Sequence, residues 1–312
     1  MPAGRAARSV PLAAGRSPGR PVEERVTEES RYLVALAEEV TEAYAAVVVP
    51  RAVLLIGSAA RGDSDRYSDL DLIAFYDEAL PSDGELRDAR RRLGLVDAES
   101  ASPRSADHVG ETFVLRGVEC QVHHQIAAAY ERELDEVLEK LDPRSTQHRA
   151  LEGVLAGKAL RGEDLIGRWR DRAARFPDGL GRAMVEAYLR FFPLWRFPHT
   201  IATRDADLWV RGVVVESAQN VLGVLAGLNR VYYTPVQLKR THQLVDRLRL
   251  SPTHLGARLD ALLAADAIAA SEELERLVGE TVELVERHMP GVDTSAVRRQ
   301  LGARQRPWTP LR

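Results

Sequence analysis

The fold is decided by residues 52–76, which read AVLLIGSAARGDSDRYSDLDLIAFY. Two apolar runs, 52–56 and 70–76, have the length and composition of buried strands. The polar segment between them is punctuated by glycine, which is typical of a tight turn and a short helix. The sequence therefore predicts two buried strands joined by a compact polar connection.

Two carboxylates, Asp69 and Asp71, stand at alternate positions where the second strand begins. Alternate side chains of a strand point to one face, so these two project together while Leu70 and Leu72 face the core. Neighbouring like charges repel each other unless a cation lies between them. Because Mg²⁺ commonly takes one or two carboxylates plus substrate phosphates, the pair indicates a magnesium site.

Gly57 and Ser58 close the first strand and open the turn. Glycine lets backbone N–H groups approach an anion, and the serine hydroxyl adds a hydrogen-bond donor. The stretch therefore predicts a phosphate cradle opposite a pair of metal-binding carboxylates. The alternative is a surface strand with two solvated aspartates after an ordinary turn, and it requires glycine, serine, spacing and strand context to coincide by chance.

The order Gly-Ser, ten intervening residues and Asp-x-Asp, with Arg61-Gly62 in between and Ser68 before the first aspartate, resembles the signature of the nucleotidyltransferase superfamily. That superfamily includes polymerase beta, kanamycin nucleotidyltransferase and aminoglycoside adenylyltransferase-like proteins. The resemblance implies a transferase that uses one or two Mg²⁺ ions and takes ATP or another NTP as co-substrate. It implies that Asp69 and Asp71 act in catalysis as metal ligands. It also implies a set of nucleotide-binding residues in the turn: Gly57, Ser58, Arg61 and Ser68.

A β-hairpin is predicted where two short apolar runs, 112–115 and 118–123, flank Arg116-Gly117. In the second run Glu119, Gln121 and His123 share one face. The superfamily carries its third acidic residue on such a strand, and the resemblance implies that Glu119 is that residue. Glu119 is then either a third metal ligand or the catalytic base for the acceptor hydroxyl, and an exposed strand glutamate is the alternative. For His123, a substrate contact and an ordinary structural or solvated histidine both stay open.

The second half of the chain is rich in helical patterns and poor in strand patterns. We expect an α+β protein in which a small mixed-sheet nucleotidyltransferase domain precedes an all-α helical bundle domain, the layout of kanamycin-type enzymes. In related enzymes a lysine of the helical domain reaches the triphosphate, so the resemblance makes Lys239 a nucleotide-binding candidate, with a solvated lysine as the alternative. The expected divisions are a disordered leader over 1–22, a catalytic domain over 23–148, a helical domain closing on substrate and nucleotide over 149–302, and a tail over 303–312.

Composition narrows the class of protein. The chain has 312 residues, a net charge of −3 and 45% hydrophobic residues, as soluble globular proteins do. A general nucleic-acid binder carries an excess of positive charge, which this chain lacks. The net charge therefore disfavours a template-using polymerase and favours a small-molecule acceptor. A single cysteine, Cys120, excludes an internal disulfide and fits a reducing cytoplasm. The longest apolar stretch, 208–228, is interrupted by polar residues, so we expect a buried helix and no membrane span.

Together these features predict transfer of AMP, or another nucleoside monophosphate, from an NTP to a hydroxyl group of a small molecule, with release of pyrophosphate. By family analogy alone the acceptor is an aminoglycoside-like antibiotic, which would make the protein an antibiotic-resistance enzyme. Two alternatives stay open: adenylylation of a protein or RNA end, and a non-catalytic nucleotide-binding or antitoxin-like protein. The sequence does not decide between a monomer and a homodimer.

Overall fold

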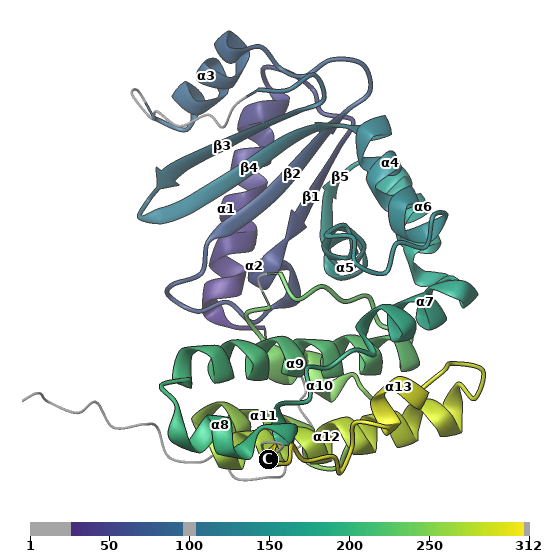
Figure 1. The fold of residues 1–312 in the computed structure, drawn as a ribbon. Helices are drawn as coiled ribbons and strands as arrows, with labels where there is room; N and C mark the ends of the chain where they lie inside the picture. Colours follow the sequence, from purple (N-terminus) through teal and green to yellow (C-terminus); the bar gives the residue numbers. More distant parts are fainter. Residues whose placement is uncertain (1–25, 96–103, 237, 309–312) are drawn as a thin grey trace, which may run out of the picture.

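The computed structural model describes residues 26–95, 104–236 and 238–308 (Figure 1). Within these ranges the chain forms a five-stranded mixed sheet with flanking helices, followed by a helical region. The expected α+β fold is thereby confirmed. The leader expected over 1–22 and the last residues of the expected tail lie outside the described ranges.

The sheet has the strand order β3-β4-β2-β1-β5. β1 lies antiparallel to β2, whereas β2 and β4 are parallel, with Asp71 level with Gln121. The predicted hairpin is confirmed as β3 and β4, whose turn residues Arg116 and Gly117 both have a positive φ. The strands are β1 (Ala52–Ile56), β2 (Leu70–Tyr76), β3 (His108–Leu115), β4 (Val118–Ile126) and β5 (Lys158–Arg161).

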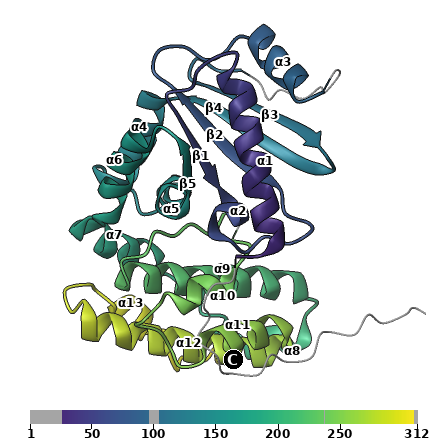
Figure 2. The ribbon, with the colours of Figure 1, turned by 180° about the vertical axis from the view of Figure 1, so that it is seen from behind.

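The two faces of the sheet are covered differently (Figures 1 and 2). One face packs against α1 (Glu28–Ala45) and α3 (Asp83–Arg92), in a core that includes Leu55, Leu72 and Val122. The other face is covered over β1 and the end of β2. The helices that cover it are α4 (Ala127–Leu138), α5 (His148–Ala156) and α6 (Glu163–Ala174).

Over β3 and β4 this second face is open within the described part of the chain. Val114 is 59% exposed, and Glu119 is exposed as well. Gln121 and His123, further along β4, are half-buried. Polar side chains on this side of β4 therefore have access to solvent.

Strand β5 was not expected from the sequence. It pairs antiparallel with β1, although it lies beyond the boundary expected near residue 148. It has only four residues, none of them fully buried, so no periodicity indicated a strand. The core that contains Leu54 and Phe75 of the sheet continues through Trp169 and Val224 into the helical region, so both parts share it. The domain limits themselves stay a prediction.

The helical region is built around α9 (Asp207–Leu228), which confirms the buried helix expected over 208–228. α9 packs between α7 (Asp178–Tyr188) and α12 (Ala267–His288) (Figure 1). α7 and α9 cross closely because Gly181 and Gly227 meet there, and a Cβ on either would lie within 3 Å of the other's carbonyl oxygen. The remaining elements are η1 (Leu194–Arg196), α8 (Pro198–Thr203), α10 (Thr241–Asp246), α11 (Leu255–Ala264) and α13 (Ser295–Arg298).

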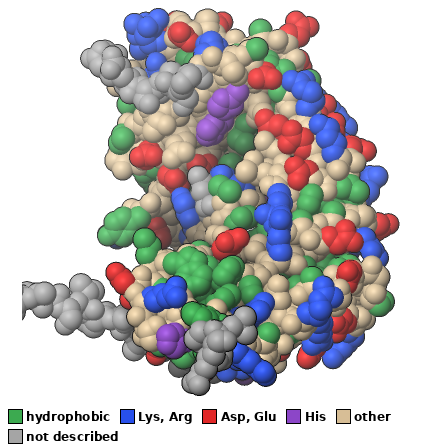
Figure 3. All heavy atoms as spheres, in the orientation of Figure 1, with side chains coloured by type: hydrophobic (Ala, Val, Ile, Leu, Met, Phe, Trp, Pro, Cys, Tyr) green, Lys and Arg blue, Asp and Glu red, His purple; other side chains and the backbone are tan. Residues whose placement is uncertain are grey.

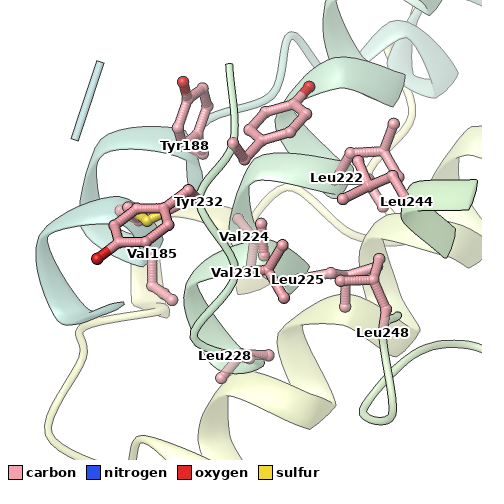
Figure 4. Close-up of a cluster of buried hydrophobic side chains, with 14 of the residues drawn as sticks. Val185, Tyr188, Leu222, Val224, Leu225, Leu228, Val231, Tyr232, Leu244 and Leu248 are labelled. Atoms are coloured by element: carbon pink, nitrogen blue, oxygen red, sulfur yellow. The ribbon is translucent and has the colours of Figure 1, made fainter. Parts of the chain in front are cut away.

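After α9 the chain returns toward the sheet, and this segment positions part of the site. Its first residues are anchored in the hydrophobic cluster of Figure 4, in which side chains of α7 and α9 pack against Val231, Tyr232, Leu244 and Leu248. Tyr232 donates its hydroxyl hydrogen to the carbonyl of Ala173 at 2.8 Å, and the Tyr233 N–H donates to His148 Nδ1 at 3.2 Å. Lys239 therefore follows a firmly packed stretch.

Every helix in the described parts of the chain is too short or too polar to span a bilayer.

Candidate functional site

Asp69 and Asp71 lie at the start of β2, on the open face of the sheet. Both are half-buried. The neighbouring strand β4 contributes Gln121, whose amide nitrogen lies 3.5 Å from Asp69 Oδ2 and 3.0 Å from Glu119 Oε1. The structure thus places three of the predicted acidic residues on one surface, with the Gln121 amide between Asp69 and Glu119.

The site holds unbalanced negative charge around Asp71. Burial, and secondly the neighbouring Asp69 carboxylate, raise the pKa of Asp71 to about 6. Lys239, Arg149 and Arg61 act in the opposite direction without cancelling this effect. A bound cation would relieve the repulsion between the two carboxylates, and oxygen ligands suit Mg²⁺. The residues present therefore fit the metal that the sequence predicts.

Gly57 is the first residue of α2 (Gly57–Arg61) and lies directly against Asp71. It has a φ of 73°, and a Cβ at this position would lie 2.5 Å from Asp71 Oδ2. Only glycine satisfies both the backbone conformation and the space. The backbone of the turn and the carboxylate consequently face each other across a gap that no side chain of residue 57 can fill.

The turn around Ser58 is held rigidly by the start of α1. The Thr27 N–H donates to the carbonyl of Gly62 at 3.0 Å, and the Thr27 hydroxyl donates to the carbonyl of Ser64 at 2.9 Å. The buried Ser64 also donates its hydroxyl hydrogen to Ser58 Oγ at 3.1 Å. A hydroxyl that accepts this bond keeps its own hydrogen for a ligand.

Ser68 stands in a turn next to the carboxylates. Its hydroxyl accepts a hydrogen bond from the Asp65 N–H at 2.9 Å and donates to Asp65 Oδ1 at 3.1 Å. The side chain therefore stabilises the turn that leads into Asp69. Its expected contact with nucleotide stays a prediction.

The helical region is attached to the signature turn at Asp63. Arg240 binds the Asp63 carbonyl at 3.2 Å and its carboxylate at 3.3 Å, and the Gln243 amide donates to the same carboxylate at 2.6 Å. Arg61 approaches the other carboxylate oxygen of Asp63 at 3.5 Å. This attachment brings the exposed Lys239, the residue before Arg240, into electrostatic range of Asp71.

The described residues contain no group of three His, Cys, Asp or Glu side chains arranged to hold a metal ion. Asp69 and Asp71 form a pair, whereas Glu119 is exposed on β4 and accepts its hydrogen bond from Gln121. Two carboxylates with phosphate oxygens as further ligands is a normal arrangement for Mg²⁺. The role of Glu119, as third ligand or as base, stays a prediction.

Sequence reasoning gave no role to several residues that the fold brings to this site. Gln121 was assigned to the correct face by strand alternation, but nothing local indicated that its amide joins two carboxylates. Arg149 comes from α5, and Asp63 and Arg240 meet across 177 residues of chain. Only the tertiary structure brings these groups together.

No family model matches the chain, and no curated protein matches its sequence. Among solved structures, the chain is similar to a nucleotidyltransferase-like protein from Exiguobacterium sibiricum, with 16% sequence identity and a TM-score of 0.33. The similarity covers 87% of this chain and 82% of that chain. At this TM-score it adds no support to any residue role, and those roles depend on the geometry of the site.

Proposed function

We propose that the protein is a Mg²⁺-dependent nucleotidyltransferase that moves AMP, or another nucleoside monophosphate, from an NTP to a hydroxyl group of a small molecule and releases pyrophosphate. The observation that carries the proposal is the opposition of Gly57 and Asp71, where backbone and carboxylate face each other across a gap that excludes a Cβ. Transfer from a metal-bound triphosphate requires hydrogen-bond donors for phosphate and ligands for a cation side by side, and the close approach of the Gly57 backbone to the Asp71 carboxylate supports both roles.

Each residue of the site has a part in this reaction. Asp69 and Asp71 would hold one or two Mg²⁺ ions, which supply positive charge to the triphosphate. The Gly57 N–H and the Ser58 hydroxyl would bind the β- and γ-phosphates. Arg61 and Lys239 would stabilise the pyrophosphate as it leaves, because charge-assisted hydrogen bonds to developing negative charge are the strong ones.

The acceptor would lie on the open face of the sheet. Figure 3 shows the surface hollowed between the sheet and the helical region, beneath a patch of histidine. Glu119 and Gln121 border this face on β4 and offer a carboxylate and an amide to hydroxyl or amino groups. A small polar molecule with several such groups fits this surface, and an aminoglycoside-like antibiotic is the first acceptor to test by family analogy.

The function is tested with ATP, Mg²⁺ and three acceptors, namely kanamycin, glucosamine and glucose, with products read by mass. We expect one acceptor to gain a nucleoside monophosphate in step with pyrophosphate release, and chelation of Mg²⁺ to stop both. Labelled ATP in a cell lysate provides the counter-test. Label only in acid-precipitable material would favour a protein or RNA acceptor, and ATP binding without any transfer would favour a non-catalytic protein.

Replacing Gly57 with alanine is expected to weaken Mg²⁺-dependent binding of a non-hydrolysable ATP analogue about 10–150-fold. The new methyl group would displace the Asp71 carboxylate, and the loss of one interaction with a charged group costs about 1.5–3 kcal/mol. The backbone conformation alone would cost about 1–2 kcal/mol of folding stability. Titration calorimetry and thermal unfolding measure the two effects.

Gly117→Ala is the matched control for Gly57→Ala. Gly117 also has a positive φ, of 83°, but a Cβ there would meet nothing within 4 Å. We expect a similar loss of stability and unchanged nucleotide binding. Equal binding by the wild-type protein and Gly57→Ala would show that the turn does not hold the triphosphate against Asp71.

A further inference from the structure

Two histidines on the open face of the sheet are hydrogen-bonded to each other. His108 is the first residue of β3 and His123 lies on β4, and His108 Nε2 is 3.1 Å from His123 Nδ1. Both imidazoles are half-buried. The other ring nitrogen of His123, Nε2, makes no hydrogen bond to any residue that the structure describes.

His123 lies close to Asp71 in the register of the sheet. Asp71 is level with Gln121 on the parallel strand β4, and His123 stands two residues further on the same face. Strands about 4.8 Å apart that rise about 3.3 Å per residue place the Cα atoms of such diagonal neighbours about 8 Å apart. Arg149 of α5 lies within electrostatic range of both side chains. The imidazole of His123 and the carboxylate of Asp71 therefore lie on the same face of neighbouring strands, beside the same arginine.

We propose that His123 is the base that takes the proton of the acceptor hydroxyl, and that His108 is the positioning residue that holds it in the required tautomer. This inference depends on the proposed function. The acceptor oxygen forms a bond to the α-phosphorus while the bond from that phosphorus to the bridging oxygen breaks. Pyrophosphate leaves with the bonding electrons, the hydroxyl proton moves to Nε2 of His123, and solvent later takes it up.

The hydrogen bond between the two rings decides which nitrogen can accept that proton. If Nδ1–H of His123 donates to Nε2 of His108, then Nε2 of His123 carries a free lone pair. The opposite arrangement would protonate His123 Nε2 and make it a donor. When His123 donates, His108 carries its own proton on Nδ1, on the ring edge away from His123, and the nearby Asp107 carboxylate raises the pKa of that ring.

Burial is the main reason that both rings stay neutral near pH 7. Burial lowers the pKa of His123, and His108, His124 and Arg149 lower it further. Burial and His124 also lower the pKa of His108, while Asp107 raises it. Arg132 in turn pairs with Asp107 at 3.1 Å. A neutral imidazole near the reacting hydroxyl can act as a general base at physiological pH.

Glu119 is the competing candidate for the base. It is exposed at the start of β4, and the Gln121 amide already binds its carboxylate. His123 is less accessible to water and retains a free nitrogen. The two assignments predict different variants to lose turnover, which makes them separable by experiment.

The first test measures the tautomer on the intact protein without any ligand. Ring ¹⁵N shifts at pH 7.5, assigned with the variants His108→Asn and His123→Asn, are expected to show His123 protonated at Nδ1 and unprotonated at Nε2. His108→Asn is expected to change that tautomer population. A wild-type His123 protonated at Nε2 would overturn the assignment, whether or not the protein transfers nucleotide.

The second test compares His123→Gln, His108→Gln and Glu119→Gln with ATP, Mg²⁺ and the acceptor identified in the panel of kanamycin, glucosamine and glucose. We expect His123→Gln to lower kcat about 10²–10⁴-fold with an unchanged KM for ATP. His108→Gln is expected to shift the acidic limb of the kcat/KM profile. Full turnover in His123→Gln would overturn the inference. It would also be overturned if the acidic limb of the kcat/KM profile disappeared in Glu119→Gln but not in the histidine variants. A wild-type protein that transfers nothing would refute the proposed function itself.

Discussion

Replacing Asp71 with asparagine is expected to abolish nucleotidyl transfer and, at pH 7 without Mg²⁺, to raise the melting temperature. Transfer is lost because the amide is a poor ligand for Mg²⁺ and leaves Asp69 alone at the site. Stability rises because the ionised carboxylate of Asp71 is partly buried beside another negative charge. A residue that costs stability where it is needed for chemistry is typical of a functional site.

The pH dependence of this effect has a definite sign. The folded protein raises the pKa of Asp71 from 3.8 to about 6, so the native state holds its proton more tightly than the unfolded chain. Ionised Asp71 therefore costs stability fully above pH 6, and the cost disappears as the pH falls below about 3.8. The difference between the two pKa values corresponds to a loss of roughly 3 kcal/mol in the free energy of unfolding. This value is an upper limit, because part of the side chain contacts water. We expect a gain of several degrees at pH 7 and almost none at pH 4.

Thermal unfolding of Asp71→Asn at pH 7 and pH 4, with and without MgATP, measures both effects. Asp77→Asn is the matched control, since Asp77 follows the other end of the same strand and is exposed. With MgATP the order of stabilities is expected to reverse, because only the wild-type site gains from binding. A variant that melts below the wild-type protein at pH 7 without Mg²⁺ would contradict the charge imbalance at this site.

The parts of the fold that the sequence predicted are those in which local pattern decides the structure. β1 and β2 are short apolar runs bounded by turn residues, and α9 is an apolar stretch long enough to be a helix. The closeness of Asp69 and Asp71 follows from strand alternation, and the turn at Gly57 follows from the glycine. These features need no knowledge of distant residues.

The parts that could not be predicted depend on contacts between distant segments. Three consecutive arginines, Arg90, Arg91 and Arg92, end α3, and Arg91 pairs with Asp88 at the surface. Arg90, however, points inward and pairs with the buried Glu111. Successive helix residues are rotated by about 100°, so three consecutive charges cannot all share one face. Composition alone does not reveal which of them turns toward the core.

Replacing Glu111 with alanine is expected to lower the free energy of unfolding by about 3–5 kcal/mol. Glu111 is 2% exposed and lies on the face of the sheet that α1 and α3 cover. Its carboxylate accepts a hydrogen bond from the Tyr44 hydroxyl at 2.5 Å, lies 2.9 Å from His124 Nε2 and pairs with Arg90. The substitution leaves a half-buried guanidinium and two buried polar groups without this partner.

Urea unfolding at pH 7 measures the loss for Glu111→Ala. Glu39→Ala is the control, because Glu39 pairs with Arg116 at the surface and such pairs contribute at most about 1 kcal/mol. Replacing Glu111 and Arg90 together by leucine is expected to recover much of the stability, since the uncompensated charge disappears. A loss below about 1 kcal/mol for Glu111→Ala would mean that the buried network contributes little to the fold.

The stability of the same buried network, which includes His124, is also expected to depend on pH. Burial, together with the charges of Arg104 and Arg90, lowers the pKa of His124 to about 3. In the unfolded chain His124 binds a proton near pH 6.5, whereas in the native state it stays neutral until about pH 3. The free energy of unfolding therefore falls as the pH drops from 6.5 toward 3. Strand alternation places His124 in the core and the adjacent His123 on the open face. A substitution at His124 should therefore change the stability of the fold and its pH dependence, while the folded protein still binds MgATP. A substitution at His123 should instead change turnover and leave the free energy of unfolding nearly unaltered.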